Sequence, residues 1–281
     1  MKKLLILLAT LGLIGIYSCD VIDPPYEEGG GGNDLGDPPQ RVILLEDYTG
    51  IKCPNCPDAA EKAHEFAKEI FPDSIIIMAI HSGDFAEPDA EHTLDLRSQT
   101  GDEITQLFNL FTQGRPIFGL GRSDLKGQKF CYEFQAEGFL EELVKETSKV
   151  KLDISVDDAS TPSNYKFNID VKFWEDQKET ENIVLYLVES GIIGVQNDNG
   201  VYLDEYEHNH VLRGSVNGTF GEPLNEYTEE LLKRGDSKSF TIDYSFDGSN
   251  GWVAENMQII ACIIDTETDY IIQCAEVDLV D

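Results

Sequence analysis

The chain of 281 residues carries 21 basic and 53 acidic side chains, which give a formal net charge of −32. Hydrophobic residues make up 41% of it, a balance typical of globular proteins and not of disordered acidic chains. So acidic a surface repels phosphate backbones, which excludes nucleic acid as a partner, and it repels anionic membranes as well. Attachment to a bilayer therefore requires an anchor other than charge.

The N-terminus has the pattern of a secretory signal peptide. Two lysines precede an apolar run, residues 4–16, which is shorter than the roughly 20 residues that a transmembrane helix needs. The small residue Ser18 stands before Cys19, as in a bacterial lipobox, although Tyr17 is larger than that motif normally has. We expect residues 1–18 to be the signal peptide and Cys19 to be the lipidated first residue of the mature chain. An ordinary export signal with an incidental cysteine is the alternative.

Residues 20–40 are rich in glycine, proline and acidic residues and hold few apolar ones. Such a composition cannot form a core and is typical of a flexible tether. Residues 19–40 are therefore interpreted as a lipidated cysteine followed by an acidic Gly/Pro-rich tether.

Strand and helix patterns alternate over residues 41–149. Apolar runs at 42–45 and 74–80 predict buried strands, and Pro57 opens a helical pattern between them. Thr100 and Glu103 have the spacing of a capping box before a second helix. An extended stretch from Ile117 to Arg122 and a last helix around residues 139–144 complete the pattern, which is typical of an α/β domain.

From residue 150 onward the hydrophobic period changes to two. About seven short apolar-polar alternating segments, separated by turn clusters such as residues 161–164 and 247–251, follow one another to the C-terminus. This pattern predicts an antiparallel β-sandwich over residues 150–281. The fold class expected for the chain is thus α/β plus all-β, in two domains.

Cys53-Pro54-Asn55-Cys56 falls between the first predicted strand and the first helix. The N-terminus of a helix lowers the pKa of a thiol, and in such pairs the first cysteine is normally the exposed nucleophile and the second the resolving thiol. Lys52 would favour the thiolate and Asp58 would oppose it. A purely structural disulfide, or half of a zinc site completed by two further ligands, is the alternative interpretation.

A proline after the second helix supports the same fold. Thioredoxin-like domains resemble one another in such a proline, usually cis, which faces the dithiol and shapes the substrate groove, and Pro116 stands at that distance. By this resemblance Cys53, Cys56 and Pro116 form the candidate catalytic site. Two departures from true thioredoxins, the absence of a tryptophan before Cys53 and the presence of Pro57 directly after Cys56, argue against generic disulfide reductase activity.

Four separated motifs, in order, resemble the Omp-twenty-eight-related outer-membrane lipoproteins of Bacteroidetes. These are Asp47 to Gly50 with Cys53 to Pro57, Gly114-Arg115-Pro116 with Arg122, His208 to Arg213 with Gly218 and Gly221, and Ile271 to Ala275. The resemblance implies a thioredoxin-like domain followed by an immunoglobulin-like domain, anchored at the outer membrane. The side of that membrane, periplasmic or surface, is left open.

The remaining cysteines are assigned one at a time. Cys262 and Cys274 lie on adjacent predicted strands at equal distances from a turn centred on Thr268, so an odd-length loop places them opposite each other. A structural cross-strand disulfide and two small buried thiols are the alternatives. Cys131 has no partner in the sequence and is expected to be buried and inert.

Two histidines form a second weak candidate for a metal site, besides the cysteine pair. His208 and His210 are two residues apart, so on a single strand they would share a face. A hydrogen-bonded pair at a sheet edge or in a loop is the favoured interpretation, so no metal and no cofactor is expected. Residues 197–200 are read as a turn.

Two functions therefore remain in competition. In the first, the protein exchanges disulfides with exported proteins, with Cys53 as nucleophile, Cys56 as resolving thiol and Pro116 beside them. In the second, it is a non-catalytic surface or assembly lipoprotein that binds an unknown partner or a second copy of itself, with Cys53–Cys56 as a structural disulfide.

Overall fold

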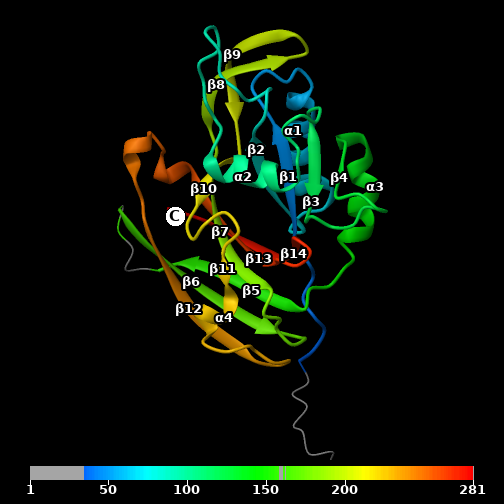
Figure 1. Ribbon diagram of the computed structural model, residues 1–281, viewed down its shortest axis with the longest axis vertical. Coiled ribbons are helices and arrows are strands. Elements are labelled where there is room, and N and C mark those ends of the chain that lie inside the picture. The colour runs from blue at the N-terminus through cyan, green and yellow to red at the C-terminus, as the bar shows by residue number, and fades with distance from the viewer. Residues whose placement is uncertain (1–34, 158–160, 162, 281) are drawn as a thin grey trace, which may run out of the picture. The chain divides into compact units, whose positions relative to one another are not determined.

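One mixed sheet of nine strands runs through both halves of the chain (Figure 1). The computed structural model describes residues 35–157, 161 and 163–280, so the predicted signal peptide and Cys19 lie outside the described residues. Eight strands follow the order β14-β13-β7-β10-β2-β1-β3-β4, and β11 pairs with β7. The strands of this sheet are β1 (Ile43–Thr49), β2 (Ile75–His81), β3 (Ile117–Leu120), β4 (Phe130–Cys131), β7 (Glu181–Glu189), β10 (Val211–Ser215), β11 (Glu222–Pro223), β13 (Met257–Asp265) and β14 (Tyr270–Asp278).

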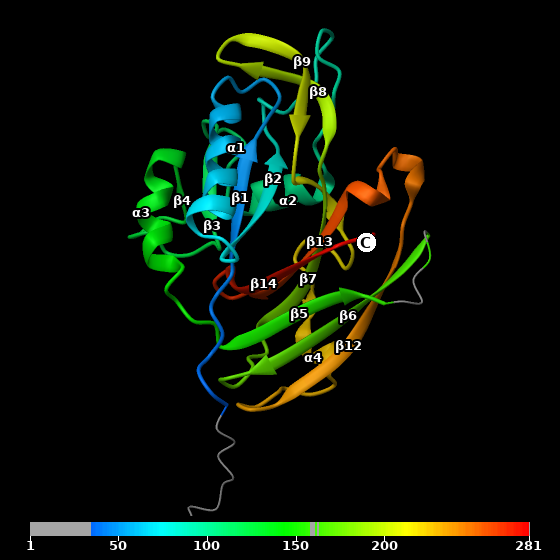
Figure 2. The ribbon, with the colours of Figure 1, turned by 180° about the vertical axis from the view of Figure 1, so that it is seen from behind.

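Three longer helices flank the part of the sheet built from the first half of the chain. They are α1 (Cys56–Glu65), which continues into a short π-helix, η1 (Phe66–Ile70), then α2 (Gln99–Leu107) and α3 (Glu133–Leu143). β1 and β2 are parallel, β3 runs antiparallel to β1, and β4 runs antiparallel to β3. In both ribbon views α1 and α3 lie on one side of these strands and α2 on the other (Figures 1 and 2).

This arrangement explains why β1 and β2 are continuous apolar runs. Alternate side chains, among them Leu45 and Ile77, pack against α1 and α3, while Leu44 and Ile80 pack on the side of α2. Every residue of both strands is buried, as expected of parallel strands covered on both faces. The predicted strand–helix alternation is confirmed for this segment.

The predicted start of α2 is wrong by two residues. Ser98 is the N-cap, and its hydroxyl accepts a hydrogen bond from the backbone N–H of Gly101 at 3.1 Å. Since an extended serine already satisfies one of the free N–H groups at the start of the helix, Thr100 lies inside the first turn and is not the cap. Glu103 instead accepts a hydrogen bond from the side chain of Gln99 at 2.7 Å.

The second half of the chain adds a β-sandwich. A three-stranded antiparallel sheet, with the order β12-β6-β5, faces β7, β13 and β14 across an apolar core. Its strands are β5 (Val150–Val156), β6 (Asn164–Phe173) and β12 (Ser237–Ser245). Inward residues such as Phe167 and Phe173 meet Leu185 and Ile259 of the larger sheet. The predicted period of two therefore marks real sheet faces, and the short helix α4 (Leu224–Thr228) follows β11.

The change of pattern near residue 150 does not interrupt the large sheet. The backbone N–H of Ala79 in β2 donates to the carbonyl oxygen of His210, just before β10, at 2.8 Å. The buried guanidinium of Arg41 donates to the carbonyl oxygens of Ile271 at 2.7 Å and Gly121 at 3.2 Å. Residues from 35 onward accordingly form one compact unit in which both halves share a sheet.

A β-hairpin that the sequence patterns did not reveal projects from the second half. Its strands are β8 (Ile192–Asp198) and β9 (Val201–His208), joined by a turn with positive φ at Asn199 and Gly200. Both views place the hairpin beside the loop that precedes α1 (Figure 2). Two single-turn 3-10 helices, η2 (Gly248–Asn250) and η3 (Ala254–Asn256), precede β13. Among the described residues, no helix has both the length and the apolar character needed to cross a membrane.

Candidate functional site

The Cys53-Pro54-Asn55-Cys56 loop connects β1 to α1, as the sequence predicts, and its two cysteines are joined by a disulfide. Their Cα atoms are 5.4 Å apart. The loop begins at Gly50, where an added Cβ atom would lie 2.5 Å from the backbone of Phe85. A glycine is therefore required there because a neighbouring loop packs directly onto the chain.

Both cysteines are buried. Cys53 is 0% exposed and Cys56 is 2% exposed. The expectation that Cys53 is an exposed nucleophile is therefore wrong for this structure. The reason is tertiary, because the β8–β9 hairpin from the other half of the chain covers the loop.

Hydrogen bonds attach the turn end of the hairpin to the cysteine loop. The side-chain amide of Gln196, itself buried, donates to the carbonyl oxygen of Cys53 at 3.0 Å. The backbone N–H groups of Asn197 and Asn199 donate to the carbonyl oxygens of Ile51 at 2.8 Å and Pro54 at 2.9 Å. Buried carbonyl groups that lose such partners are costly, so these bonds favour the closed arrangement.

Pro116 lies near the end of β1, the strand that leads into this loop. It precedes β3, its peptide bond with Arg115 is cis, and the pairing of Ile117 with Tyr48 brings it to the end of β1. Arg115 is buried, and its guanidinium donates to the hydroxyl of Ser82 at 3.3 Å.

A small cavity of about 30 Å³ adjoins the second cysteine. Its lining comes from both halves of the chain; beside apolar groups it includes Cys56, Asp47, Thr49, His81, Gln196, Tyr206 and His208. Burial raises the pKa of Asp47 to about 7, against which the guanidinium of Arg115 acts in the lowering direction. A carboxyl group that titrates near neutral pH therefore lies beside the disulfide, which is an arrangement suited to holding or releasing a proton.

The two histidines singled out in the sequence do not share a strand face. β9 ends at His208, and His210 has a positive φ of 56° in the connection to β10. His208 packs against His81 with ring centroids 5.5 Å apart, while His210 lines a separate cleft. Within residues 35–157 and 163–280, no group of three or more His, Cys, Asp or Glu side chains is arranged to hold a metal ion.

Burial governs the protonation of these imidazoles. It lowers the pKa of His208 to about 4 and that of His81 well below its usual value, with the neighbouring imidazole adding to the effect on His81. Both rings are therefore neutral at physiological pH.

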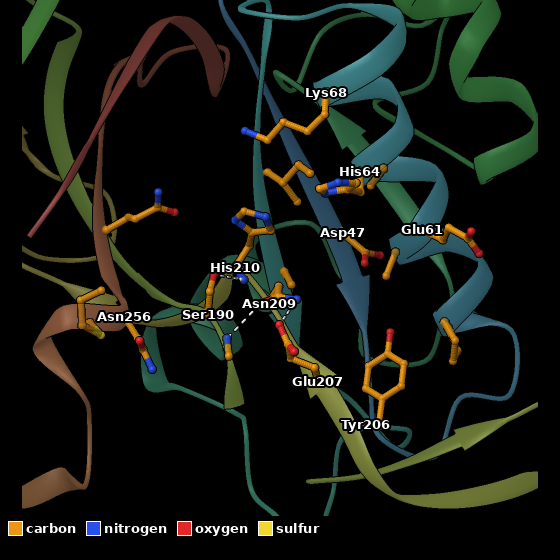
Figure 3. Close-up of a pocket in the computed structure, with 18 of the residues that line it drawn as sticks. Asp47, Glu61, His64, Lys68, Ser190, Tyr206, Glu207, Asn209, His210 and Asn256 are labelled. Carbon is orange, nitrogen blue, oxygen red and sulfur yellow. Dashed lines mark hydrogen bonds between the residues drawn. The ribbon is translucent and has the colours of Figure 1, made fainter. Parts of the chain in front are cut away.

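A larger cleft of about 870 Å³ lies beside α1, on the face of the large sheet that α2 does not cover (Figure 3). Its walls come from α1, one face of β2, the end of β9 and the segment that leads into β13. Asp47, His64 and Lys68 stand on one side of it, and Tyr206 and His210 on the other (Figure 3). A cavity of this size matches ordinary small-molecule or peptide sites.

Sequence patterns predict little of this site. They place Asp47 in a motif but do not mark it as a site residue, and they do not mark Gln196 or Tyr206 at all. The Asn-Asp-Asn-Gly turn at residues 197–200 was recognised, and this turn between two apolar-containing runs is a hairpin signal that would have revealed β8 and β9.

The two C-terminal cysteines lie opposite each other on adjacent strands, as their equal distances from the turn predict. Cys262 on β13 pairs directly with Cys274 on β14, and their sulfur atoms are 3.3 Å apart as unbonded thiols. Cys131 is buried, as expected, and burial raises the pKa of its thiol to about 12, which keeps it protonated.

The large sheet also carries a buried ion pair between Glu46 and Arg122. The guanidinium of Arg122 donates to both carboxylate oxygens of Glu46, with the shortest distance 2.7 Å, and both side chains are at most 1% exposed. Arg122 follows β3 and Glu46 lies on β1, so the pair ties the turn after β3 to the neighbouring strand.

Comparison with known protein families identifies the family of this chain. A family model described as outer membrane protein Omp28 matches residues 114–280, more than half of the chain. The chain belongs to the Omp28 family. The resemblance seen in the sequence motifs is thereby confirmed, and the family is one of the outer membrane.

Two solved structures are also similar to the chain. The chain is similar to HBP35 of Porphyromonas gingivalis at 17% sequence identity and a TM-score of 0.62, over 86% of this chain and 76% of that one. It also matches a domain of the outer membrane lipoprotein Omp28 from the same organism at 23% identity and a TM-score of 0.30, over 47% of this chain and 88% of that one. None of the curated proteins matches the chain. The likeness to HBP35 concerns the fold alone, which in this Omp28-family chain is a mixed α/β structure with large β-sheet content.

Proposed function

We propose that this Omp28-family protein is a non-catalytic binding lipoprotein of the outer membrane, in which Cys53–Cys56 is a fixed staple. The observation that carries the proposal is the burial of both cysteines under the β8–β9 hairpin. Thiol–disulfide exchange requires a thiolate to reach one of the two sulfur atoms. In the closed arrangement neither is accessible, so the bond acts as a cross-link that holds the loop under the hairpin.

The staple has a direct effect on the neighbouring cleft. The loop that it constrains leads into α1, and the hairpin that covers it carries Tyr206 and Glu207 at the cleft edge. Both walls of the cleft are therefore held in place by the covered disulfide. Such preorganisation lowers the cost of ordering a site when a ligand binds.

The finer fold assignments belong to the same proposal. The order β2-β1-β3-β4, with α1 beginning at the cysteine pair, supports a thioredoxin-like unit over residues 41–149. The three-stranded sheet packed against β7, β13 and β14 supports an immunoglobulin-like unit over residues 150–281. In this proposal the first unit retains the site geometry of a redox fold while the second covers it.

Lipid anchoring through Cys19, after removal of residues 1–18, completes the proposal. Replacing the residue in C19A should move the protein from the membrane fraction to the soluble fraction, since a lipidated cysteine followed by a tether is the anchor we infer. Retention of the variant in the membrane fraction would contradict this part of the proposal. Protease accessibility of intact cells would then distinguish a surface-facing from a periplasm-facing protein.

The redox test uses the mature chain carrying the C19A substitution, equilibrated with defined glutathione ratios. Thiols at Cys53 and Cys56 are then labelled and counted. A fixed staple should remain oxidised at potentials of about −300 mV, whereas a couple that titrates between about −120 and −270 mV would overturn the proposal in favour of exchange.

Disulfide exchange gated by the hairpin is the second candidate. It is favoured by Asp47, whose pKa of about 7 and position in the cavity beside Cys56 suit a proton acceptor for the resolving thiol. In this case the hairpin must open before a partner reaches Cys53, so labelling would occur only at the rate of opening. A hairpin variant with faster labelling and a potential in the exchange range would favour this candidate over the staple.

A further inference from the structure

The cleft beside α1 has an excess of carboxylate groups. Its acidic lining residues, drawn from β1, α1, β8, β9, η3 and the end of β14, are Asp47, Asp58, Glu61, Asp198, Glu207, Glu255 and Asp278. Lys68 is the one lysine or arginine in the described lining, and the histidines His64 and His210 accompany it. This charge balance favours a cationic ligand, and a second observation points to where its charged group would lie.

That observation is the carboxyl group of Asp47. Its residue is 2% exposed, its Oδ1 atom is buried, and no described residue forms a hydrogen bond with that atom. Asp47 also lines the cleft, toward which its side chain projects (Figure 3). Buried polar groups are nearly always hydrogen-bonded, so an unpartnered carboxyl oxygen at a cavity wall marks the place of a donor.

Two further groups lie at the same end of the cleft. The hydroxyl end of Tyr206 points toward Asp47 (Figure 3). The carboxylate of Glu207 is oriented by the side-chain amide of Asn209, which donates to it at 3.2 Å, and Asn209 in turn accepts from the backbone N–H of Gly191 at 2.9 Å. The carboxylate of Glu207 is therefore held in place by the protein before any ligand arrives.

The opposite end has the opposite character. His64, near the end of α1, and Lys68, on η1, project toward the cleft, and His210 lies across from them (Figure 3). Glu61, although it lines the cleft, points away from this interior (Figure 3). A cation is therefore directed to the end formed by Asp47, Tyr206 and Glu207, away from Lys68.

We propose that this cleft binds a ligand that presents an ammonium or guanidinium group, with the cationic head against Asp47 and Glu207 and beside the hydroxyl of Tyr206. The inference rests on the proposed binding function and names the chemical class of its ligand. An ammonium group offers three N–H donors and a guanidinium five, which matches a site composed of acceptors. Charge-assisted hydrogen bonds of this kind are the stronger ones in proteins.

The test measures binding to the mature chain carrying C19A by calorimetry and by NMR chemical-shift changes. The probes are the capped tripeptides acetyl-Ala-Lys-Ala-amide and acetyl-Ala-Arg-Ala-amide, the neutral acetyl-Ala-Gln-Ala-amide, and free 1,5-diaminopentane. We expect the basic probes to bind about tenfold or more tightly than the glutamine peptide. Tighter binding of the tripeptides than of the diamine assigns the site to basic side chains of polypeptides, and the reverse assigns it to free amines.

The variants locate the site within the cleft. D47N should weaken binding of the basic probes about tenfold or more, and E207Q, at an exposed position, should weaken it several-fold. E141Q is the matched control, because it removes the same charge from an exposed position of α3 and should change affinity less than about twofold. Near-UV circular dichroism of D47N checks that the variant is folded, and E207Q provides the same information if it is not.

Three outcomes would overturn the inference: equal binding of the glutamine and lysine peptides, no binding of any basic probe, or unchanged affinity in both cleft variants. None of them depends on the redox state of Cys53–Cys56. A titratable disulfide would overturn the proposed staple without affecting these results, so the two failures are distinguishable.

Discussion

The side-chain amide of Gln196 donates a hydrogen bond to the carbonyl oxygen of Cys53 at 3.0 Å, across 143 residues of sequence. The same amide also reaches the carbonyl oxygen of Gly50 at 3.4 Å. One side chain of the hairpin thus satisfies two buried acceptors of the loop that carries the disulfide. This contact couples the accessibility of the cysteine pair to the position of a hairpin from the other half of the chain.

Removing that amide should loosen the hairpin. In Q196A the carbonyl oxygens of Cys53 and Gly50 lose a buried donor, which should lower the free energy of unfolding by about 1–3 kcal/mol. Reduction of Cys53–Cys56 by a phosphine, followed by thiol labelling, should become faster. The control is Q106A, at an exposed position of α2, which should leave both quantities unchanged. Equal reduction rates in the wild type and Q196A would show that the hairpin does not protect the disulfide.

Acid should weaken the hairpin through His208. Burial lowers the pKa of this imidazole from 6.5 to about 4. Above pH 6.5 the imidazole is neutral in both the folded and the unfolded chain, so its burial then costs no deprotonation. As the pH falls from 6.5 through 4 the unfolded chain binds the proton first, and stability decreases by up to about 3 kcal/mol. His81, packed against it, acts in the same direction.

Urea unfolding of the wild type and H208Q at pH 4, 5 and 7 measures this effect. The variant lacks the titrating group, so its unfolding free energy should depend less steeply on pH across that range. Parallel pH profiles for the two proteins would contradict the assignment. Phosphine reduction of the disulfide, which proceeds in acid, should likewise accelerate more in the wild type than in H208Q.

Asp47 should act in the opposite direction. Its pKa is raised from 3.8 to about 7, chiefly by burial, with Glu133 adding to the rise and Arg115 opposing it. The stabilising contribution of its protonated form is complete below pH 3.8 and is lost as the pH rises through 7. D47N remains neutral, so its stability relative to the wild type should increase by up to about 4 kcal/mol between pH 4 and pH 8.

The measurement is again urea unfolding as a function of pH, now on the wild type and D47N. The matched control is E141Q, whose carboxylate is exposed and should give a constant difference from the wild type. A constant difference for D47N as well would show that Asp47 titrates at an ordinary pKa.

Cys262 and Cys274 should close into a disulfide in an oxidising compartment. Their sulfur atoms are 3.3 Å apart on paired strands, so bond formation requires only a small approach. A disulfide-bearing oxidant would take up the two electrons and two protons that the thiols lose. The bond should stabilise the protein by about 2–4 kcal/mol.

Intact mass and thiol counting in denaturant test this prediction on C19A protein purified without reductant. The oxidised form should lack two hydrogen atoms and show Cys131 as the one remaining titratable thiol in the described chain, in place of three. In C262A the loss of two hydrogens should not occur at this pair. Three titratable thiols in wild-type protein exported to an oxidising compartment would sink the idea.

Local features of this chain could be predicted because their causes are local. The buried runs that became β1 and β2 are apolar at every position, and the alternation of Phe167, Ile169 and Val171 follows from the pleat of a strand. The opposition of Cys262 and Cys274 follows from counting residues around one turn. The start of α2 was misjudged because Ser98 and Thr100 are both acceptable caps by residue type, and only the backbone conformation distinguishes them.

The site could not be predicted in the same way, since its decisive contacts join residues far apart in the sequence. The spacing of Cys53 and Cys56 identified the disulfide loop and its place before a helix, which short-range geometry determines. Whether the loop is open or covered depends on Gln196, and the protonation of Asp47 depends on how deeply the folded chain buries it. The sequence by itself determined that this is an acidic, two-pattern chain with a cysteine pair at a strand–helix junction, and it predicts an export signal at the N-terminus. Only the tertiary structure decided that the pair is covered and that a carboxylate-lined cleft lies open beside it, because burial is a property of the packed halves together.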